Sequence, residues 1–489
     1  MTKLLKLDWF IKSLAIFSGL EIWSLWCYQL DWLNWSSLIA IVAVAGWLVW
    51  RDFRWSIFLL AGEVFWGSLG RSFYWELAGF DLSVRMVIFA LVVLIWLIKY
   101  RSSWKKLKWS GWNLRSTVLA LGFVLLGIMI GLGHNSWSAI WTDANGWLFL
   151  IFYLLWLPFF ELEIMPKLVA LLAAAVVVIS LKTLLLVNLF ANDYAWANVG
   201  YWYLWVRDTK VGELTYITEG FWRVFLQSQL YAVIIWLAVS LAGFLRLLAI
   251  KKGPLLLGAL AFSTVLSSQS RSFWLVGGLT LIVSFILMCW PKKRQLAWSR
   301  GLAVFCGSLL GGLLLFTLAL TVPSGRFNIR DIFTTRLSQT ASSSARLNQL
   351  AVLLPGWRQN WLIGAGFGSS LTYLNPDPRQ LTYQNRNGEY TTFSFELGWL
   401  DIAFKLGLLG LLAMIFLVGQ PLLQATRLWL LKQQPLTLFI FVGLLFLTGL
   451  HFLTPYLNHP LGLIWLVIAK LALDKLQLSY ETDHQPADL

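Results

Sequence analysis

Residues 167–190 read KLVALLAAAVVVISLKTLLLVNLF, and this stretch decides the class of fold. Lys167 and Lys182 are its only charged residues. A helix needs about 20 mostly apolar residues to cross the hydrocarbon core of a bilayer, and this stretch is long enough. Because lipid offers no hydrogen bonds to the backbone, a stretch of this kind must be helical. We therefore expect a transmembrane helix here.

The composition of the whole chain indicates the same environment. Of the 489 residues, 58% are hydrophobic and 12% are charged, whereas soluble globular proteins carry about 25% charged residues. The 31 tryptophans fit a membrane protein, because tryptophan gathers at the two edges of a bilayer. These numbers exclude a disordered chain, a coiled coil and a soluble enzyme. They predict an all-α polytopic integral membrane protein.

Similar apolar windows recur along the chain and predict about 14 transmembrane helices in a single transmembrane domain over residues 1–489. The windows lie near 11–30, 36–50, 55–69, 83–99, 116–133, 146–160, 167–190, 229–249, 254–269, 273–290, 302–322, 397–417, 436–453 and 460–473.

Basic residues gather in alternate loops and predict the orientation. Segment 99–115 alone contains six lysines and arginines and no acidic residue. With 14 spans, all such loops fall on one side, which the positive-inside rule makes cytoplasmic. Both termini are then cytoplasmic, and we attribute the net charge of +15 to this rule rather than to a nucleic acid partner. The other basic residues are Lys3, Lys6, Arg51, Arg54, Lys251, Lys252, Lys292, Lys293, Arg294, Arg300, Arg427 and Lys432.

Two long loops then lie on the outer face, over residues 191–228 and 323–395. The second loop, expected to be partly helical, lies between spans 11 and 12 and contains seven arginines but no lysine. Guanidinium binds phosphate or carboxylate through two parallel hydrogen bonds, which ammonium does not. The arginines therefore predict an anionic ligand, although pairing with Asp331, Asp377, Glu389 and lipid headgroups is the simpler alternative. They are Arg326, Arg330, Arg336, Arg346, Arg358, Arg379 and Arg386.

Two further arginines lie at the outer edge of predicted spans. Arg271 lies between spans nine and ten, and Arg223 precedes span eight. Each could be an anchor whose charge snorkels to the interface. Since they share a face with the arginine-rich loop, they are also candidates for a functional site.

Glu396 stands at the outer mouth of span twelve, where it could accept a proton from a hydroxyl or simply favour the helix dipole. Asp401 and Lys405 are four residues apart and can pair on one helical face.

The glycine-rich segment 364–368 lacks the lysine and serine or threonine of a P-loop, so a plain turn is the simpler interpretation. The four histidines, His134, His451, His459 and His484, form no metal-binding motif. We expect no metal and no cofactor.

Four stretches, taken in order, are similar to those of a known family. They are GFWRVF at 220–225, SQSRSFW at 268–274, the block from Ala345-Arg346 through WLIGAGFG at 361–368, and ELGWLDIAFKLGLLG at 396–410. In these motifs the chain resembles the O-antigen ligase and O-antigen polymerase superfamily of bacterial envelope polysaccharide biosynthesis. The resemblance covers roughly residues 220–415. It implies a location in the bacterial cytoplasmic membrane.

The resemblance implies a glycosyltransferase whose donor is a glycan on undecaprenyl pyrophosphate. The expected reaction is polymerisation onto another lipid-linked repeat, or ligation to a different acceptor. Arg271 and Arg346 would bind the pyrophosphate with support from Arg223, and Glu396 would be catalytic together with Arg271. Other partners would be membrane lipid, a flippase and a chain-length regulator of the same pathway.

The sequence departs from the family at three positions of its last motif. Glu396 replaces a histidine that many ligases of the family have, Leu397 replaces the asparagine that follows it, and Lys405 stands where the family has a glutamate.

Two other classes of function compete with a glycosyltransferase. A transporter or flippase for an anionic solute would have ionisable groups near the middle of the membrane; Glu21, Glu63 and Lys182 come nearest to that pattern. A scaffold for an envelope assembly complex would leave the outer arginines unexplained.

Overall fold

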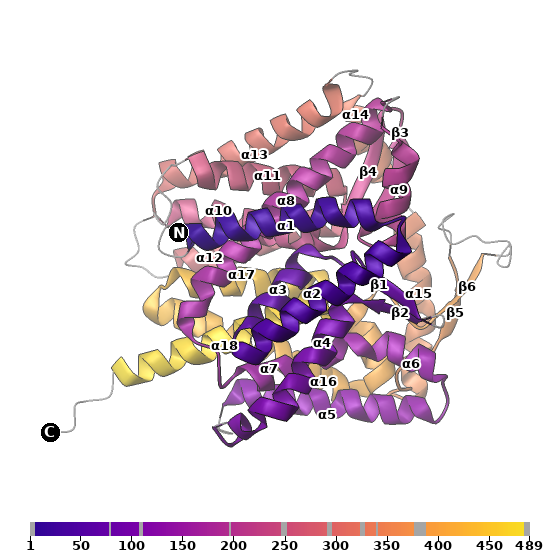
Figure 1. Ribbon diagram of the computed structural model, residues 1–489, viewed down its shortest axis with the longest axis vertical. Helices are drawn as coiled ribbons and strands as arrows, with labels where there is room; N and C mark the ends of the chain where they lie inside the picture. The colour runs from indigo at the N-terminus through magenta and orange to yellow at the C-terminus, as the bar shows by residue number, and fades with distance from the viewer. Residues whose placement is uncertain are drawn as a thin grey trace. The chain divides into compact units, whose positions relative to one another are not determined.

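The computed structural model describes residues 5–77, 80–106, 111–194, 197–245, 252–290, 296–322, 328–338, 341–375 and 388–483 (Figure 1). It divides into two compact units. Unit 1 consists of Met1–Leu107 and Pro158–Arg336, and unit 2 of Lys108–Leu157 and Leu337–Leu489. Several residues discussed above lie outside the described residues, namely Lys3, Lys108, Lys251, Lys292, Lys293, Arg294, Arg326, Asp377, Arg379, Arg386 and His484.

The structure confirms an all-α multi-pass membrane protein. Each predicted apolar window overlaps helical residues of the described parts of the chain. Among the described residues, eight helices are long and apolar enough to cross a membrane. The total of about 14 spans remains a prediction.

Unit 1 contains most of the helices. They are α1 (Leu7–Cys27), α2 (Asp31–Arg51), α3 (Trp55–Trp66), α4 (Val84–Ile95), α8 (Met165–Asn192), α9 (Val199–Asp208), α10 (Leu230–Phe244), α11 (Lys252–Ser268), α12 (Arg271–Cys289), α13 (Trp298–Thr321) and α14 (Ile329–Ser338). A π-helical turn, Trp96–Tyr100, continues α4.

Helix α8 is the central helix of unit 1. It packs against α1, α3, α10, α11 and α13 (Figure 1). In its most apolar window 78% of the residues are buried, whereas the corresponding share is only 22% in each of α1, α2 and α13. The peripheral helices therefore expose apolar faces, as expected of helices surrounded by lipid.

Buried ion pairs neutralise the charges that lie within the helices of unit 1. Lys182 Nζ lies 2.5 Å from Glu21 Oε1, and Arg85 Nε lies 2.5 Å from Glu63 Oε2. Pairing is the usual condition for ionisable groups inside a membrane protein. Glu21, Glu63 and Lys182, the groups that a transporter would use, are thus each held in an ion pair.

Short antiparallel hairpins interrupt the helices of unit 1. Strands β1 (Tyr74–Leu77) and β2 (Phe80–Ser83) form one, and β3 (Gly212–Thr218) and β4 (Phe221–Leu226) form the other. The second hairpin lies in the segment predicted as the first outer loop. In it Thr215 faces Arg223, and β4 packs against α8 and α11.

Unit 2 is built around a long, kinked helix. Helix α16 (Gly398–Lys432) contacts α5, α15, α17 and α18. The other elements of unit 2 are α5 (Trp112–Leu132), α6 (Trp137–Ala144), α7 (Ile151–Trp156), α15 (Ala341–Gln359), α17 (Pro435–Leu450), α18 (Pro460–Asp483), β5 (Leu371–Leu374) and β6 (Glu389–Thr392).

The glycine-rich segment 364–368 lies along the kink of α16. Gly407 breaks the helix with a φ of 69°, a region that favours glycine. Ala365 donates its backbone N–H to the carbonyl of Phe404, and Gly366 donates to that of Lys405. A side chain on Gly364 would come within 2.3 Å of the Lys405 backbone. The segment is therefore a packed turn whose glycines permit close backbone approach.

Candidate functional site

The turn between α11 and α12 gathers arginines from three parts of unit 1. Arg223 Nε, on β4, donates to the carbonyl of Ser268 at 2.7 Å. Arg336 Nε, on α14, donates to the carbonyl of Gln269 at 2.9 Å. Arg271 is the first residue of α12. We call Arg223, Ser268, Gln269, Arg271 and Arg336 the arginine turn.

The backbone of the arginine turn explains why cations gather there. Carbonyls at the end of a helix have no intrahelical partner and carry the negative end of the helix dipole, so they attract cations. Gln269 directly follows the last residue of α11, and its backbone φ of 46° lies in the left-handed region that terminates the helix. Arg223 is buried, and its guanidinium lies 4.6 Å from the centre of the Phe225 ring. Bonds to carbonyls therefore hold the side chains of Arg223 and Arg336 at this turn.

A polar atom within the arginine turn is left without a partner. Gln269 is fully buried, and its Nε2 donates to the carbonyl of Leu266 at 2.9 Å. Its Oε1 has no hydrogen-bond partner among the described residues. Such an atom is costly to bury, by about 1–3 kcal/mol.

The sequence singled out Arg223 and Arg271 at this turn, and the structure adds Arg336. That residue stood among the seven arginines of the outer loop with nothing to distinguish it. Its contact with Gln269 spans 67 residues of sequence, and no local pattern signals such a pairing.

Arg346 and Glu396 lie together in unit 2. Arg346 Nε, on α15, is 2.8 Å from Glu396 Oε2, and the side chains are 24% and 44% exposed. The Nε–H is not directed at the carboxylate and has no hydrogen-bond partner among the described residues. The two side chains thus form a partly exposed ion pair. Arg346, a predicted ligand of the pyrophosphate, contacts Glu396, the predicted base.

Gln349 connects Glu396 to Tyr373, a residue of strand β5. Its Oε1 accepts the backbone N–H of Glu396 at 2.9 Å, and its Nε2 donates to the hydroxyl of Tyr373 at 2.9 Å. Burial raises the pKa of Tyr373, and the negative charge of Glu396 contributes to the same shift. The phenol therefore keeps its proton at neutral pH. We call Arg346, Gln349, Tyr373 and Glu396 the Glu396 network.

The predicted pairing of Asp401 with Lys405 is confirmed, with Nζ 2.7 Å from Asp401 Oδ1. The sequence did not reveal a second carboxylate, Asp143 of α6, whose Oδ1 lies 2.5 Å from the same Nζ. Asp143 Oδ2 also accepts the backbone N–H of Gly368 at 2.9 Å. All three charged side chains are at most 8% exposed. This cluster holds the glycine-rich turn and the first turns of α16 together.

A comparison with protein families supports the resemblance. Residues 256–415 match the family model described as O-antigen ligase. Over these residues the chain is similar to O-antigen ligases, which confirms the resemblance noted in the sequence. The match implies a glycosyltransferase-like enzyme of the ligase and polymerase type. No curated protein matches the chain.

The region similar to O-antigen ligases contains most of the candidate residues. Arg271, Arg336, Arg346 and Glu396 lie within residues 256–415, and Arg223 precedes them. Within the part of the chain that the structure describes, no group of three or more His, Cys, Asp or Glu side chains is arranged to hold a metal ion.

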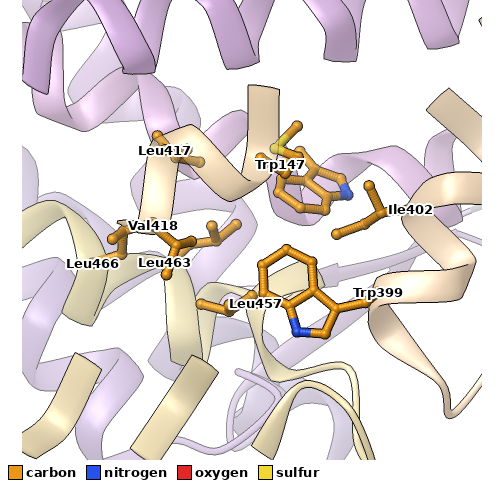
Figure 2. A pocket seen from close by; sticks show the side chains of 9 residues that line it. Trp147, Trp399, Ile402, Leu417, Val418, Leu457, Leu463 and Leu466 are labelled. Carbon is orange, nitrogen blue, oxygen red and sulfur yellow. The ribbon is translucent and has the colours of Figure 1, made fainter. Parts of the chain in front are cut away.

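A small pocket in unit 2 is apolar throughout. Figure 2 shows the indoles of Trp147 and Trp399 beside aliphatic side chains. No arginine lines it, so it offers nothing to bind a diphosphate. Its other lining residues are Ile402, Met414, Leu417, Val418, Leu457, Leu463 and Leu466.

Proposed function

We propose that the protein is a polysaccharide polymerase of the bacterial cytoplasmic membrane. It transfers a glycan from undecaprenyl pyrophosphate to a hydroxyl of another lipid-linked repeat, on the outer face. The observation that carries the proposal is the gathering of Arg223, Arg271 and Arg336 at one turn, where backbone carbonyls accept hydrogen bonds from two of them. The match to O-antigen ligases supports the reaction class.

The arginine turn acts on the leaving group. As the bond between the anomeric carbon and the diphosphate oxygen breaks, the electron pair stays with the diphosphate and its negative charge grows. Arg271, with Arg223 and Arg336 in support, stabilises this charge more in the transition state than in the ground state. Because the arginines are already positioned, little reorganisation is needed during the reaction. Arg346 is a further ligand of the diphosphate.

Glu396 acts on the acceptor. The acceptor oxygen forms the new bond to the anomeric carbon while its proton passes to the carboxylate. The 44% exposure of the Glu396 side chain supports this role, since the carboxylate is accessible to an acceptor. The diphosphate activates the donor, so the transfer needs no nucleotide sugar. A flippase would supply the donor, and a chain-length regulator would set the length of the product.

One experiment separates this proposal from its alternatives. Purified protein is incubated with lipid-linked repeat units, and the products are resolved by size. A polymerase gives a ladder, whereas a ligase gives a single transfer to a different acceptor. A transporter of anionic solutes gives no product. The kink of α16 argues against transport. A transporter would use the backbone groups freed at a helix break to bind its solute, but here the carbonyls of Trp361 and Leu362 accept the N–H groups of Leu408 and Leu409 that follow the kink.

The orientation is tested by cysteine labelling. In a variant whose three cysteines are replaced by serine, Arg330→Cys should react with a membrane-impermeant maleimide from outside the cell. Arg427→Cys, in a predicted cytoplasmic loop, is the matched control and should react only after the membrane is opened. The reverse pattern would contradict the proposed topology.

A further inference from the structure

Helix α15 joins three segments of unit 2 along one face. Arg346, Gln349 and Leu353 are three and four residues apart, the spacing at which side chains of a helix share a face. Leu353 is buried in an apolar cluster with Phe395 and Phe404. Gln349 lies one turn before Leu353, and Arg346 lies one turn earlier still. Apolar packing therefore fixes α15 against the segment that carries Glu396.

Gln349 is a buried polar side chain with a bond at each end of its amide. It is only 2% exposed, and burying an amide is unfavourable unless it is hydrogen-bonded. The two bonds also set its orientation, since the oxygen must face the N–H of Glu396 and the nitrogen must face Tyr373. Neither of these hydrogen bonds is part of the backbone pattern of a helix or a sheet. Since an apolar side chain of the same volume would fill the space equally well, we infer that the amide serves to hold its two partners.

The hydroxyl of Tyr373 is held by two side chains. It accepts from Gln349 Nε2 and is also hydrogen-bonded to the side chain of Asn375. The neighbouring Asn348 donates from Nδ2 to the carbonyl of Leu374 at 2.6 Å and holds the same strand. Strand β5 is thus fixed to α15 at two successive residues.

We propose that Gln349 is a positioning residue of an acceptor site. Its amide holds the backbone of Glu396 and directs the hydroxyl of Tyr373, so that the carboxylate takes the proton of the reacting hydroxyl. This inference rests on the proposed glycosyl transfer.

The test separates the two bonds of Gln349 by substitution. Gln349→Met removes both bonds at similar volume, and we expect kcat to fall about 100-fold, the usual effect of a small misplacement of a reacting group. The KM for the lipid-linked donor should stay unchanged. Tyr373→Phe removes only the bond at the other end of the amide, so kcat should fall by about tenfold, the value of one lost hydrogen bond.

A third variant tests whether the carboxylate that Gln349 positions is the base. Gln349→Glu keeps an acceptor for the N–H of Glu396 but adds a negative charge beside that residue. Like charges disfavour ionisation, so the acidic limb of the pH–rate profile should move to higher pH. If Glu396 is not the base, the pH profile of the folded enzyme should stay in place. Gln359→Met, at the exposed end of the same helix, is the control and should behave as the wild type.

The results identify which proposal fails. If the wild type transfers no glycan, the proposed function itself is wrong. If the wild type transfers glycan but folded Gln349→Met keeps its kcat, Gln349 has no positioning role. An unchanged pH profile in Gln349→Glu would show that Glu396 is not the base, and an unchanged kcat in Tyr373→Phe would show that Tyr373 does not orient the amide.

Discussion

Two regions of the molecule hold cations in opposite ways. In the arginine turn, Nε of Arg223 and of Arg336 donates to backbone carbonyls. At the start of α16, Lys405 contacts the carboxylates of Asp143 and Asp401. A carbonyl accepts a hydrogen bond without carrying a formal charge, whereas each carboxylate carries one. We therefore propose anion binding for the arginine turn and a stabilising role for the Lys405 cluster.

Breaking the Lys405 cluster should give the largest effect on stability. Lys405→Met leaves two carboxylates buried without their cation, and we expect the free energy of unfolding in detergent to fall by about 3–5 kcal/mol. The matched control is Arg427→Met, an exposed position on the same helix, which should change it by at most about 0.5 kcal/mol. Equal stability of the two variants would show that the cluster does not support the fold.

Changing the arginine turn should instead affect activity. Arg271→Lys keeps the positive charge but loses the bidentate hydrogen bonding by which a guanidinium binds a phosphate group. We expect glycan transfer to fall about 100- to 1000-fold, as when one donor to a developing negative charge is removed. The amount of protein in the membrane should not change. Arg330→Lys, at an exposed site on α14, should transfer at the wild-type rate. Normal polymer from Arg271→Lys would remove the arginine turn from the mechanism.

The Glu396 network should show an intermediate effect. Glu396→Gln cannot accept a proton, and we expect kcat to fall about 100-fold while donor binding is kept. Glu389→Gln, on the exposed part of strand β6, serves as the control. Steady-state kinetics of the purified protein measures both variants. Unchanged turnover in Glu396→Gln would show that another group accepts the proton.

An exposed ion pair should give the smallest effect. The hydrogen bond from Arg54 lowers the pKa of Asp52 below its ordinary value. The pair therefore contributes stability at neutral pH, and this contribution is lost as the pH falls through the lowered pKa. Since the two side chains are 51% and 36% exposed, Arg54→Gln should cost at most about 1 kcal/mol. Thermal unfolding at pH 7 and pH 3 measures it, and an equal cost at both values would contradict the assignment.

The sequence predicted the helices well because the bilayer imposes a simple rule on them. An apolar stretch of sufficient length must form a helix in lipid, and residues 167–190 form the buried helix α8. The pairing of Asp401 with Lys405 was equally predictable, since both residues lie on one helix face.

The contacts that assemble the candidate site were not predictable in the same way. Asp143 meets Lys405 across 262 residues of sequence, and Gln349 meets the backbone of Glu396 across 47. Periodicity reports only on residues within one element. The hairpin that places Arg223 was missed for a related reason: its short strands lie in a segment that the charge pattern marked only as a loop.

The central claim is that guanidinium groups of the arginine turn stabilise a departing diphosphate. It is tested most directly by the rate at which purified protein releases undecaprenyl diphosphate from lipid-linked repeat units. We expect the wild type to release one diphosphate for each glycan transferred, and Arg271→Lys to lose both activities together. Glycan transfer at the wild-type rate by Arg271→Lys, or transfer without release of diphosphate, would contradict the account.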